Sequence, residues 1–148
     1  HDQVAYGLRI DALQAAILAA KLPYLGEWVR IKDEIAEQYN AALADSELAL
    51  PTVSLTATHG WHLYVVRTGQ RDRVLSQLQS NGIAAGVHYP VPLHLQPAYA
   101  YLGYQPGSLP VTEAVAQSCL SLPLYAEMTS EQIDYVVQSV LMAVSQPV

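Results

Sequence analysis

The sequence has little of several residue types: no phenylalanine, one cysteine (Cys119), and seven lysine and arginine residues among 148. One cysteine excludes an internal disulfide and favours a reducing compartment, so we expect a cytoplasmic protein. Seven basic residues against 13 acidic ones give a formal net charge of −6. No basic face can be built from so few positive charges, so we expect no nucleic-acid partner. No apolar run is long enough to span a bilayer, and we expect no membrane association.

What the sequence does contain is typical of a folded domain. Hydrophobic residues make up 51% and charged residues 14%, which argues against intrinsic disorder. A length of 148 residues is enough to bury one core. Because the chain starts at His1 without an initiator methionine, we interpret it as a piece of a longer protein.

The hydrophobic spacing predicts an α/β (α+β) chain. Apolar residues recur at three- and four-residue steps over 11–22 and 24–43, which predicts a pair of helices interrupted at Pro23. Later residues predict three strands (61–67, 83–87 and 119–122) and three helices, the last after a capping box of Thr129 and Gln132. We therefore expect a helical segment, 1–45, and a small domain, 46–148, in which helices pack on a three-stranded, mainly antiparallel sheet.

The segment 86–94, GVHYPVPLH, is the strongest candidate for a site. Its two prolines restrict the backbone, so the side chains of His88, Tyr89 and His94 are presented at low entropic cost. Two interpretations stay open from the local sequence alone. The segment is either a ligand-contacting loop or a rigid connection between a strand and a helix.

A metal site is the alternative use of these histidines. His88 and His94 would need a third ligand, such as His59 or His62. No Cys/His spacing matches a structural zinc motif and no HExxH is present, so we expect no metal.

The remaining reactive side chains favour structural roles. Lys21 and Lys32 are the only lysines, and both fall where we expect surface positions rather than the desolvated pocket that a Schiff-base lysine needs. Cys119 opens an apolar strand, so we expect a buried core thiol.

Four stretches in matching order resemble the DegT/DnrJ/EryC1/StrS family of pyridoxal-phosphate-dependent sugar aminotransferases. They are HDQVAYGLRIDALQAAILAAKL (1–22), HLY with the later Arg71-Asp72 (62–72), NGIAAGVHYPVPLHLQPAY (81–99) and SLPLY (121–125). The resemblance covers nearly the whole chain and implies the C-terminal part of such an enzyme. In that family a large domain carries the cofactor and the catalytic lysine, a small domain closes over the site, and the active sites lie at a dimer interface.

The resemblance also implies roles for single residues. His88, Tyr89 and His94 become substrate-binding residues for a nucleotide-linked sugar, and Arg9 becomes a cofactor-binding residue with an anion-binding role. The family motif Gly-x-Asn-x-Arg has Gly7 in place of its asparagine, which removes the side chain that usually helps hold the cofactor phosphate.

Neither lysine falls at the family's catalytic position, so the resemblance implies no catalytic residue in this chain. We expect pyridoxal phosphate in the full-length family but not on this chain alone, and no transamination by it. The alternative is a stand-alone ligand-binding or oligomerisation domain. In either case we expect a homo-oligomer, a dimer or larger, because the first two helices carry apolar faces without a partner.

Overall fold

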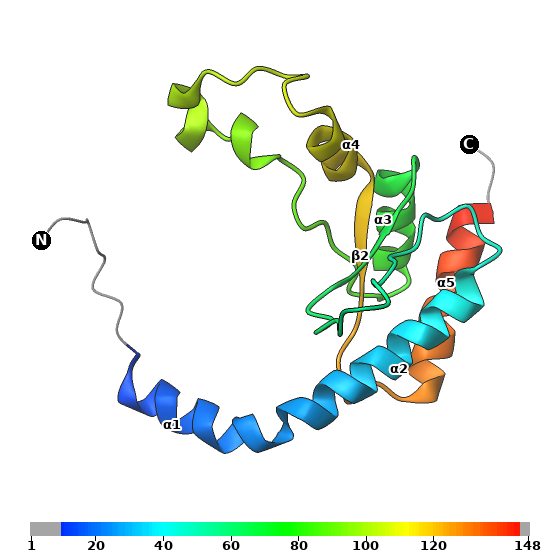
Figure 1. Cartoon of the computed structure of the whole chain (residues 1–148). Helices are drawn as coiled ribbons and strands as arrows, with labels where there is room; N and C mark the ends of the chain where they lie inside the picture. Colours follow the sequence, from blue (N-terminus) through cyan, green and yellow to red (C-terminus); the bar gives the residue numbers. More distant parts are fainter. Residues whose placement is uncertain (1–9, 146–148) are drawn as a thin grey trace, which may run out of the picture.

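Two helices at the start of the chain form one curved arm that leads into the core (Figure 1). The computed structural model describes residues 10–145. Its elements are α1 (Ala12–Lys21), η1 (Leu22–Tyr24), α2 (Leu25–Leu43), β1 (Tyr64–Arg67), α3 (Arg71–Ser80), η2 (Leu93–Leu95), η3 (Pro97–Leu102), α4 (Pro110–Ser118), β2 (Cys119–Leu122) and α5 (Ser130–Ser145). The interruption predicted at Pro23 is the 3₁₀ turn η1, which joins the two helices without folding them back on each other.

The arm is exposed at its start and buried at its end. No residue of α1 is buried, although its N-terminus is capped by the Asp11 carboxylate, which accepts from the Leu13 N–H at 2.8 Å. In the second half of α2, by contrast, Tyr39 and Leu43 are fully buried. The first helix therefore stands away from the core, and the second enters it.

The sheet consists of β1 and β2, paired antiparallel with Tyr64 opposite Leu122 and Arg67 opposite Cys119. Helices α3 and α5 pack against each other, and α2 packs on α5. The mixed helix and antiparallel sheet predicted from the sequence is confirmed in class. Cys119 is buried as predicted, with 2% of its surface exposed.

The prediction of a strand at 83–87, the second of the three expected, is wrong. This stretch forms only one isolated bridge, between Gly86 and Ser121. The physical reason is local: the Ile83 N–H donates to Leu78 O at 3.0 Å and the Ala85 N–H donates to Ile83 O at 2.8 Å. The Ala85–Ile83 bond closes a tight turn rather than an extended strand, so the pairing with β2 stays limited to Gly86.

Two helix ends have the local geometry that their residues favour, and the predicted capping box is confirmed. Gly82 ends the turn after α3 with a φ of 75°, the left-handed conformation that favours glycine. At the start of α5, the Thr129 N–H donates to Gln132 Oε1 at 3.0 Å, and the Gln132 N–H donates to Thr129 Oγ1 at 3.3 Å. This is the reciprocal capping box.

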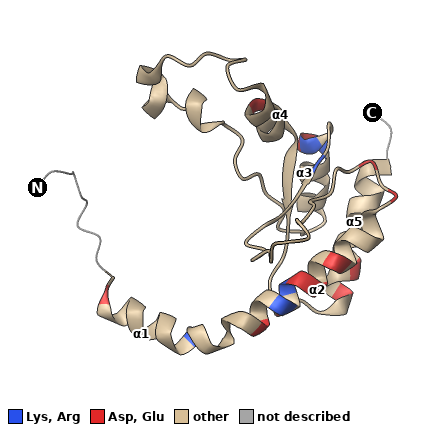
Figure 2. Ribbon diagram, in the orientation of Figure 1, with Lys and Arg blue, Asp and Glu red and all other residues tan. Residues whose placement is uncertain are grey.

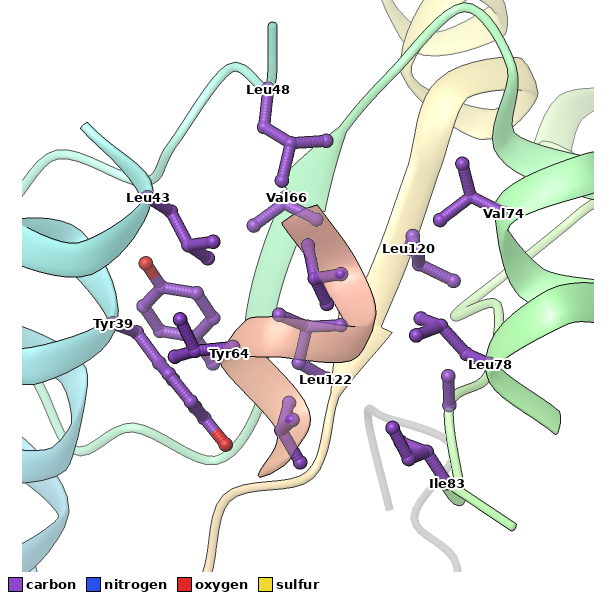
Figure 3. Packing of buried hydrophobic residues seen from close by; sticks show 14 of the residues in the cluster. Tyr39, Leu43, Leu48, Tyr64, Val66, Val74, Leu78, Ile83, Leu120 and Leu122 are labelled. Atoms are coloured by element: carbon purple, nitrogen blue, oxygen red, sulfur yellow. The ribbon is translucent and has the colours of Figure 1, made fainter. Parts of the chain in front are cut away.

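The core fills the space between the sheet and the helices (Figure 3). The two buried tyrosines lie side by side, with Tyr39 and Tyr64 ring centroids 5.0 Å apart. Their hydroxyls are paired, since Tyr39 donates to Pro123 O at 2.9 Å and Tyr64 donates to Asn40 Oδ1 at 2.7 Å. In residues 10–145, no helix is both long and apolar enough to cross a membrane.

Candidate functional site

The candidate segment starts a long irregular loop that leaves the core after Gly86 and returns at α4. The loop contains the short 3₁₀ turns η2 and η3 and reaches out from the core, as α1 does on another side (Figure 1). Its surface is rich in exposed apolar and tyrosine side chains, among them Tyr89, Leu93 and Tyr101. Long ordered loops of this kind usually serve a site or an interface.

His88 is tied to the strand β2. Its Nδ1 lies 3.0 Å from Ser121 Oγ, and Ser121 is itself buried, with 4% of its surface exposed. Two backbone bonds join Gly86 and Ser121 beside this contact, at 2.8 and 3.1 Å. A Cβ on Gly86 would lie 3.3 Å from His88 Cε1, which is tighter than ordinary contact. The glycine therefore leaves room for the imidazole to fold back on the strand.

Tyr89 is presented outward. The residue is 72% exposed, and its ring meets the His88 ring edge-on, with centroids 5.4 Å apart. Within residues 10–145 its hydroxyl has no hydrogen-bond partner. A phenol in this state offers one donor and one acceptor to a ligand.

His94 faces the inside of the loop. It is 8% exposed, its Nε2 lies 3.0 Å from Glu113 Oε1, and its ring meets that of Tyr104 edge-on at 5.8 Å. Glu113 also accepts from the N–H groups of Gly107 and Leu109, at 2.8 and 3.2 Å. The Gly107 N–H above all, and then the His94 ring, hold the pKa of Glu113 below its usual range.

The structure therefore brings His88 and Tyr89 together and gives His94 a separate partner. The metal alternative is not assembled, because His59 Nδ1 accepts from the Trp61 N–H at 2.9 Å and the two loop histidines have other partners. Among residues 10–145 no group of three histidine, cysteine, aspartate or glutamate side chains is placed to hold a metal ion.

The two lysines do not offer a covalent cofactor site. Lys32 Nζ donates to Gly60 O at 3.0 Å, and Lys21 Nζ lies 5.7 Å from the centre of the Trp28 ring. Lys21 is exposed and Lys32 half-buried, so neither amine has the desolvated surroundings that favour a Schiff base. The described residues therefore do not fit a lysine-bound cofactor. Arg9 and Gly7, the positions predicted to meet the cofactor phosphate, lie outside the described residues.

Two residues that shape this loop, Ser121 and Glu113, were not predicted from the sequence. Ser121 lies in an apolar strand, and the sequence pattern there predicts that the residue is buried but not what it contacts. Glu113 has a visible signal, because no lysine, arginine, aspartate or glutamate occurs between Arg73 and Glu113. A carboxylate that ends so long an uncharged stretch, beside loop histidines, is a candidate for pairing with them.

Comparison with known proteins agrees with the resemblance found in the sequence. The chain is similar to the erythromycin biosynthesis sensory transduction protein EryC1 of Saccharopolyspora erythraea, with 39% identity over 142 residues, 93% of this chain and 38% of that protein. It is also similar to the dTDP-3-amino-3,4,6-trideoxy-alpha-D-glucose transaminase of Streptomyces venezuelae, with 37% identity over 141 residues, 95% of this chain and 37% of that protein.

Solved structures share the fold. The chain superposes on S. venezuelae DesV with a TM-score of 0.92 and 35% identity, covering 100% of this chain and 40% of that one. A putative sugar aminotransferase of Streptococcus pneumoniae in its PLP form matches with a TM-score of 0.86 at 24% identity, over 97% of this chain and 37% of that one.

The chain thus spans about 38% of the length of the curated relatives it matches, and by length it corresponds to a part of such a protein. The expected cofactor of the family, pyridoxal phosphate, is confirmed at the level of the family and its solved structures. The family's sequence model matches residues 1–141. The chain belongs to the DegT/DnrJ/EryC1/StrS aminotransferase family.

Proposed function

We propose that this chain is the C-terminal, substrate-side part of a pyridoxal-phosphate-dependent aminotransferase that acts on a nucleotide-linked sugar. The observation that carries the proposal is the presentation of Tyr89, whose exposed hydroxyl has no partner in the described part of the chain, beside a His88 ring tied to β2. A sugar offers the hydroxyl groups that such a phenol and imidazole recognise. Family membership supplies the reaction class.

The proposal divides the roles among the predicted residues. His88 and Tyr89 contact the substrate, and His94, with its Nε2 already engaged, shapes the loop from inside. Arg9 binds an anionic group, as the resemblance implies. Residues 1–45 join the domain of residues 46–148 to the lysine-bearing part of the enzyme, and the absence of any buried residue in α1 supports this division. A single, buried, free cysteine supports a cytoplasmic location.

Pyridoxal phosphate, when bound in a family member, acts as the electron sink for amino transfer. Because neither lysine here fits a covalent site, we propose that this chain alone does not transfer amino groups. The test mixes the purified chain with pyridoxal phosphate and an amino donor. We expect no visible absorbance of a lysine-bound cofactor and no turnover. Covalent binding with turnover would overturn the assignment of the lysine to another part of the enzyme.

Titration calorimetry with nucleoside-diphosphate sugars tests the substrate-side role. We expect Tyr89→Phe to weaken binding by about three- to tenfold, since one hydrogen bond is lost. Tyr101→Phe is the matched control, because Tyr101 is 80% exposed on the same loop. Equal affinities for the two variants would contradict the role of Tyr89, and no heat for any nucleotide sugar would contradict the function.

A second role, self-association, is favoured by the apolar face of α1. The side chains of Leu13 and Ile17 are 71% and 51% exposed, and Leu18, Leu22 and Leu25 with Trp28 line a hollow of about 480 Å³ on the arm. Exposed patches of this kind drive association. We propose a homodimer or larger assembly of this chain through α1. Sedimentation of the chain and of Leu13→Ser/Ile17→Ser tests it: we expect an assembly and a monomer respectively, and a monomeric wild type would refute it.

A further inference from the structure

Glu113 is the only carboxylate in the described part of the chain that forms a hydrogen bond to the long loop before α4. The stretch between Arg73 and Glu113 carries no lysine, arginine, aspartate or glutamate, and Figure 2 shows this part of the chain without charged colour until α4. The loop can therefore form no ion pair within itself. Any charge-assisted bond that orders it has to come from a side chain outside it.

Glu113 supplies such bonds at two distant points of the loop. Its Oε2 accepts from the Gly107 N–H at 2.8 Å, and its Oε1 accepts from the Leu109 N–H at 3.2 Å, both near the end of the loop. The same Oε1 lies 3.0 Å from His94 Nε2, 13 residues before Gly107. Side-chain exposure is 5% for His94 and 15% for Glu113. Hydrogen bonds to a charged, largely buried carboxylate are stronger than hydrogen bonds between neutral groups.

The His94 contact also bears on the proposed substrate side. The short segment from His88 to His94 is held at its two ends, by Ser121 Oγ on β2 and by Glu113 on α4. Tyr89 lies between these two attachments, and Pro90 and Pro92 limit the backbone that separates it from His94. Only four residues, two of them prolines, therefore separate Tyr89 from the His94 contact.

We propose that Glu113 is a positioning residue, which through His94 sets the place of segment 88–94 and so the direction in which Tyr89 presents its hydroxyl to the substrate. This inference rests on the proposed function only for what Tyr89 binds. It differs from a simple helix cap, in which Glu113 would stabilise the first turn of α4 through Gly107 and Leu109 alone.

Amide hydrogen exchange separates the two roles without any ligand. The Leu95 N–H, which donates to Pro92 O at 3.0 Å in η2, reports on the His94 end. In Glu113→Gln we expect the Gly107, Leu109 and Leu95 amides to exchange about tenfold faster, because the charge-assisted bonds are weakened. The ¹⁵N signals of the His94 and His88 rings should move as well. If the Gly107 and Leu109 amides exchange faster but the Leu95 amide does not, Glu113 acts only as a helix cap, and the proposal is overturned.

Two further variants serve as controls. Glu131→Gln removes the matching first-turn carboxylate of α5, and we expect wild-type exchange at all three amides. His94→Asn keeps Glu113 with its two N–H donors, and we expect faster exchange at Leu95 alone. If Glu113→Gln does not fold, the exchange rate of the Leu95 amide in His94→Asn tests the proposal. An unchanged rate in that variant would overturn it.

Ligand affinity completes the test. We expect Glu113→Gln to bind a nucleoside-diphosphate sugar about tenfold more weakly than Glu131→Gln, if Tyr89 is displaced by loss of the contact. A wild-type chain that binds no such ligand would refute the proposed function, and the exchange data would still decide whether Glu113 positions the segment. Binding that is equal in the two variants would overturn the positioning role.

Discussion

His88 Nδ1 and Ser121 Oγ lie 3.0 Å apart, so an exposed loop histidine is fixed to a buried strand residue 33 positions later. The contact is reinforced by the two backbone bonds between Gly86 and Ser121. One strand position thus holds both the backbone and the side chain of the segment that presents Tyr89.

Removing this hydroxyl should loosen the loop at modest cost to the fold. We expect Ser121→Ala to lower the free energy of unfolding by about 1 kcal/mol, the usual net value of one hydrogen bond. The ¹⁵N signals of the His88 ring should shift toward those of a free histidine. Urea unfolding and NMR measure the two effects. Ser118→Ala, which removes an exposed helix hydroxyl bonded to Ala114 O, is the control, and identical behaviour of the two variants would contradict the assignment.

The turn before β1 depends on a bond from α2. Trp61 is 3% exposed and has a φ of 44°, and its indole Nε1 donates to Asp33 Oδ1 at 2.6 Å. We expect Asp33→Ala to lower the free energy of unfolding by about 1 to 3 kcal/mol, because a buried donor loses a charged acceptor. Asp33→Asn should cost less, since it keeps an acceptor.

Denaturant unfolding followed by tryptophan fluorescence measures this cost. Glu37→Ala changes an exposed carboxylate on the same helix and should leave stability within about 0.5 kcal/mol of the wild type. A cost for Asp33→Ala no larger than that of Glu37→Ala would show that the indole bond contributes nothing.

Because two tyrosines are buried in the core, we expect the folded protein to lose stability at alkaline pH. Burial raises the pKa of Tyr64 to about 12, and it raises the pKa of Tyr39 as well, with a contribution from the neighbouring Tyr64. In the unfolded chain both phenols ionise near their ordinary value of about 10. The unfolded state therefore releases protons that the folded state keeps, and stability falls as the pH rises from about 10 through about 12.

Urea unfolding over this pH range measures the effect. Tyr64→Phe removes one of the two phenols, so its stability should fall less steeply with pH, although it loses the bond to Asn40 and starts about 1 kcal/mol lower. Tyr101→Phe alters an exposed phenol and should keep the wild-type slope. A Tyr64→Phe curve parallel to that of the wild type would contradict the raised pKa.

The loop should respond to acid through Glu113. The bonds from Gly107 and His94 hold the pKa of this carboxyl below its ordinary value of 4.5. The stabilisation is present above the ordinary value and is lost as the pH falls below 4.5 through the lowered folded-state pKa. The Gly107 and Leu109 amide signals should follow this titration in NMR spectra. They should not do so in Glu113→Gln, and a titration that persists in that variant would point to another group.

Local features of this protein could be predicted from the sequence because their partners are close along the chain. The helix spacing, the break at Pro23, the left-handed Gly82 and the capping box of Thr129 and Gln132 each involve residues within a few positions. The family could be predicted for a similar reason, since its motifs are runs of adjacent residues that need no tertiary structure to be seen.

The tertiary structure decided what each candidate side chain contacts. From the sequence His88, Tyr89 and His94 form one set, because they lie in one short segment. In the fold His88 pairs with Ser121 and His94 with Glu113. Of these three side chains, only that of Tyr89 has no hydrogen-bond partner within residues 10–145. The predicted strand 83–87 does not form, because the chain there is bent by the bonds from the Ile83 N–H to Leu78 O and from the Ala85 N–H to Ile83 O. Hydrophobic spacing predicts where helices and strands form, whereas burial and pairing depend on which elements the tertiary packing brings together, as the exposed apolar face of α1 shows.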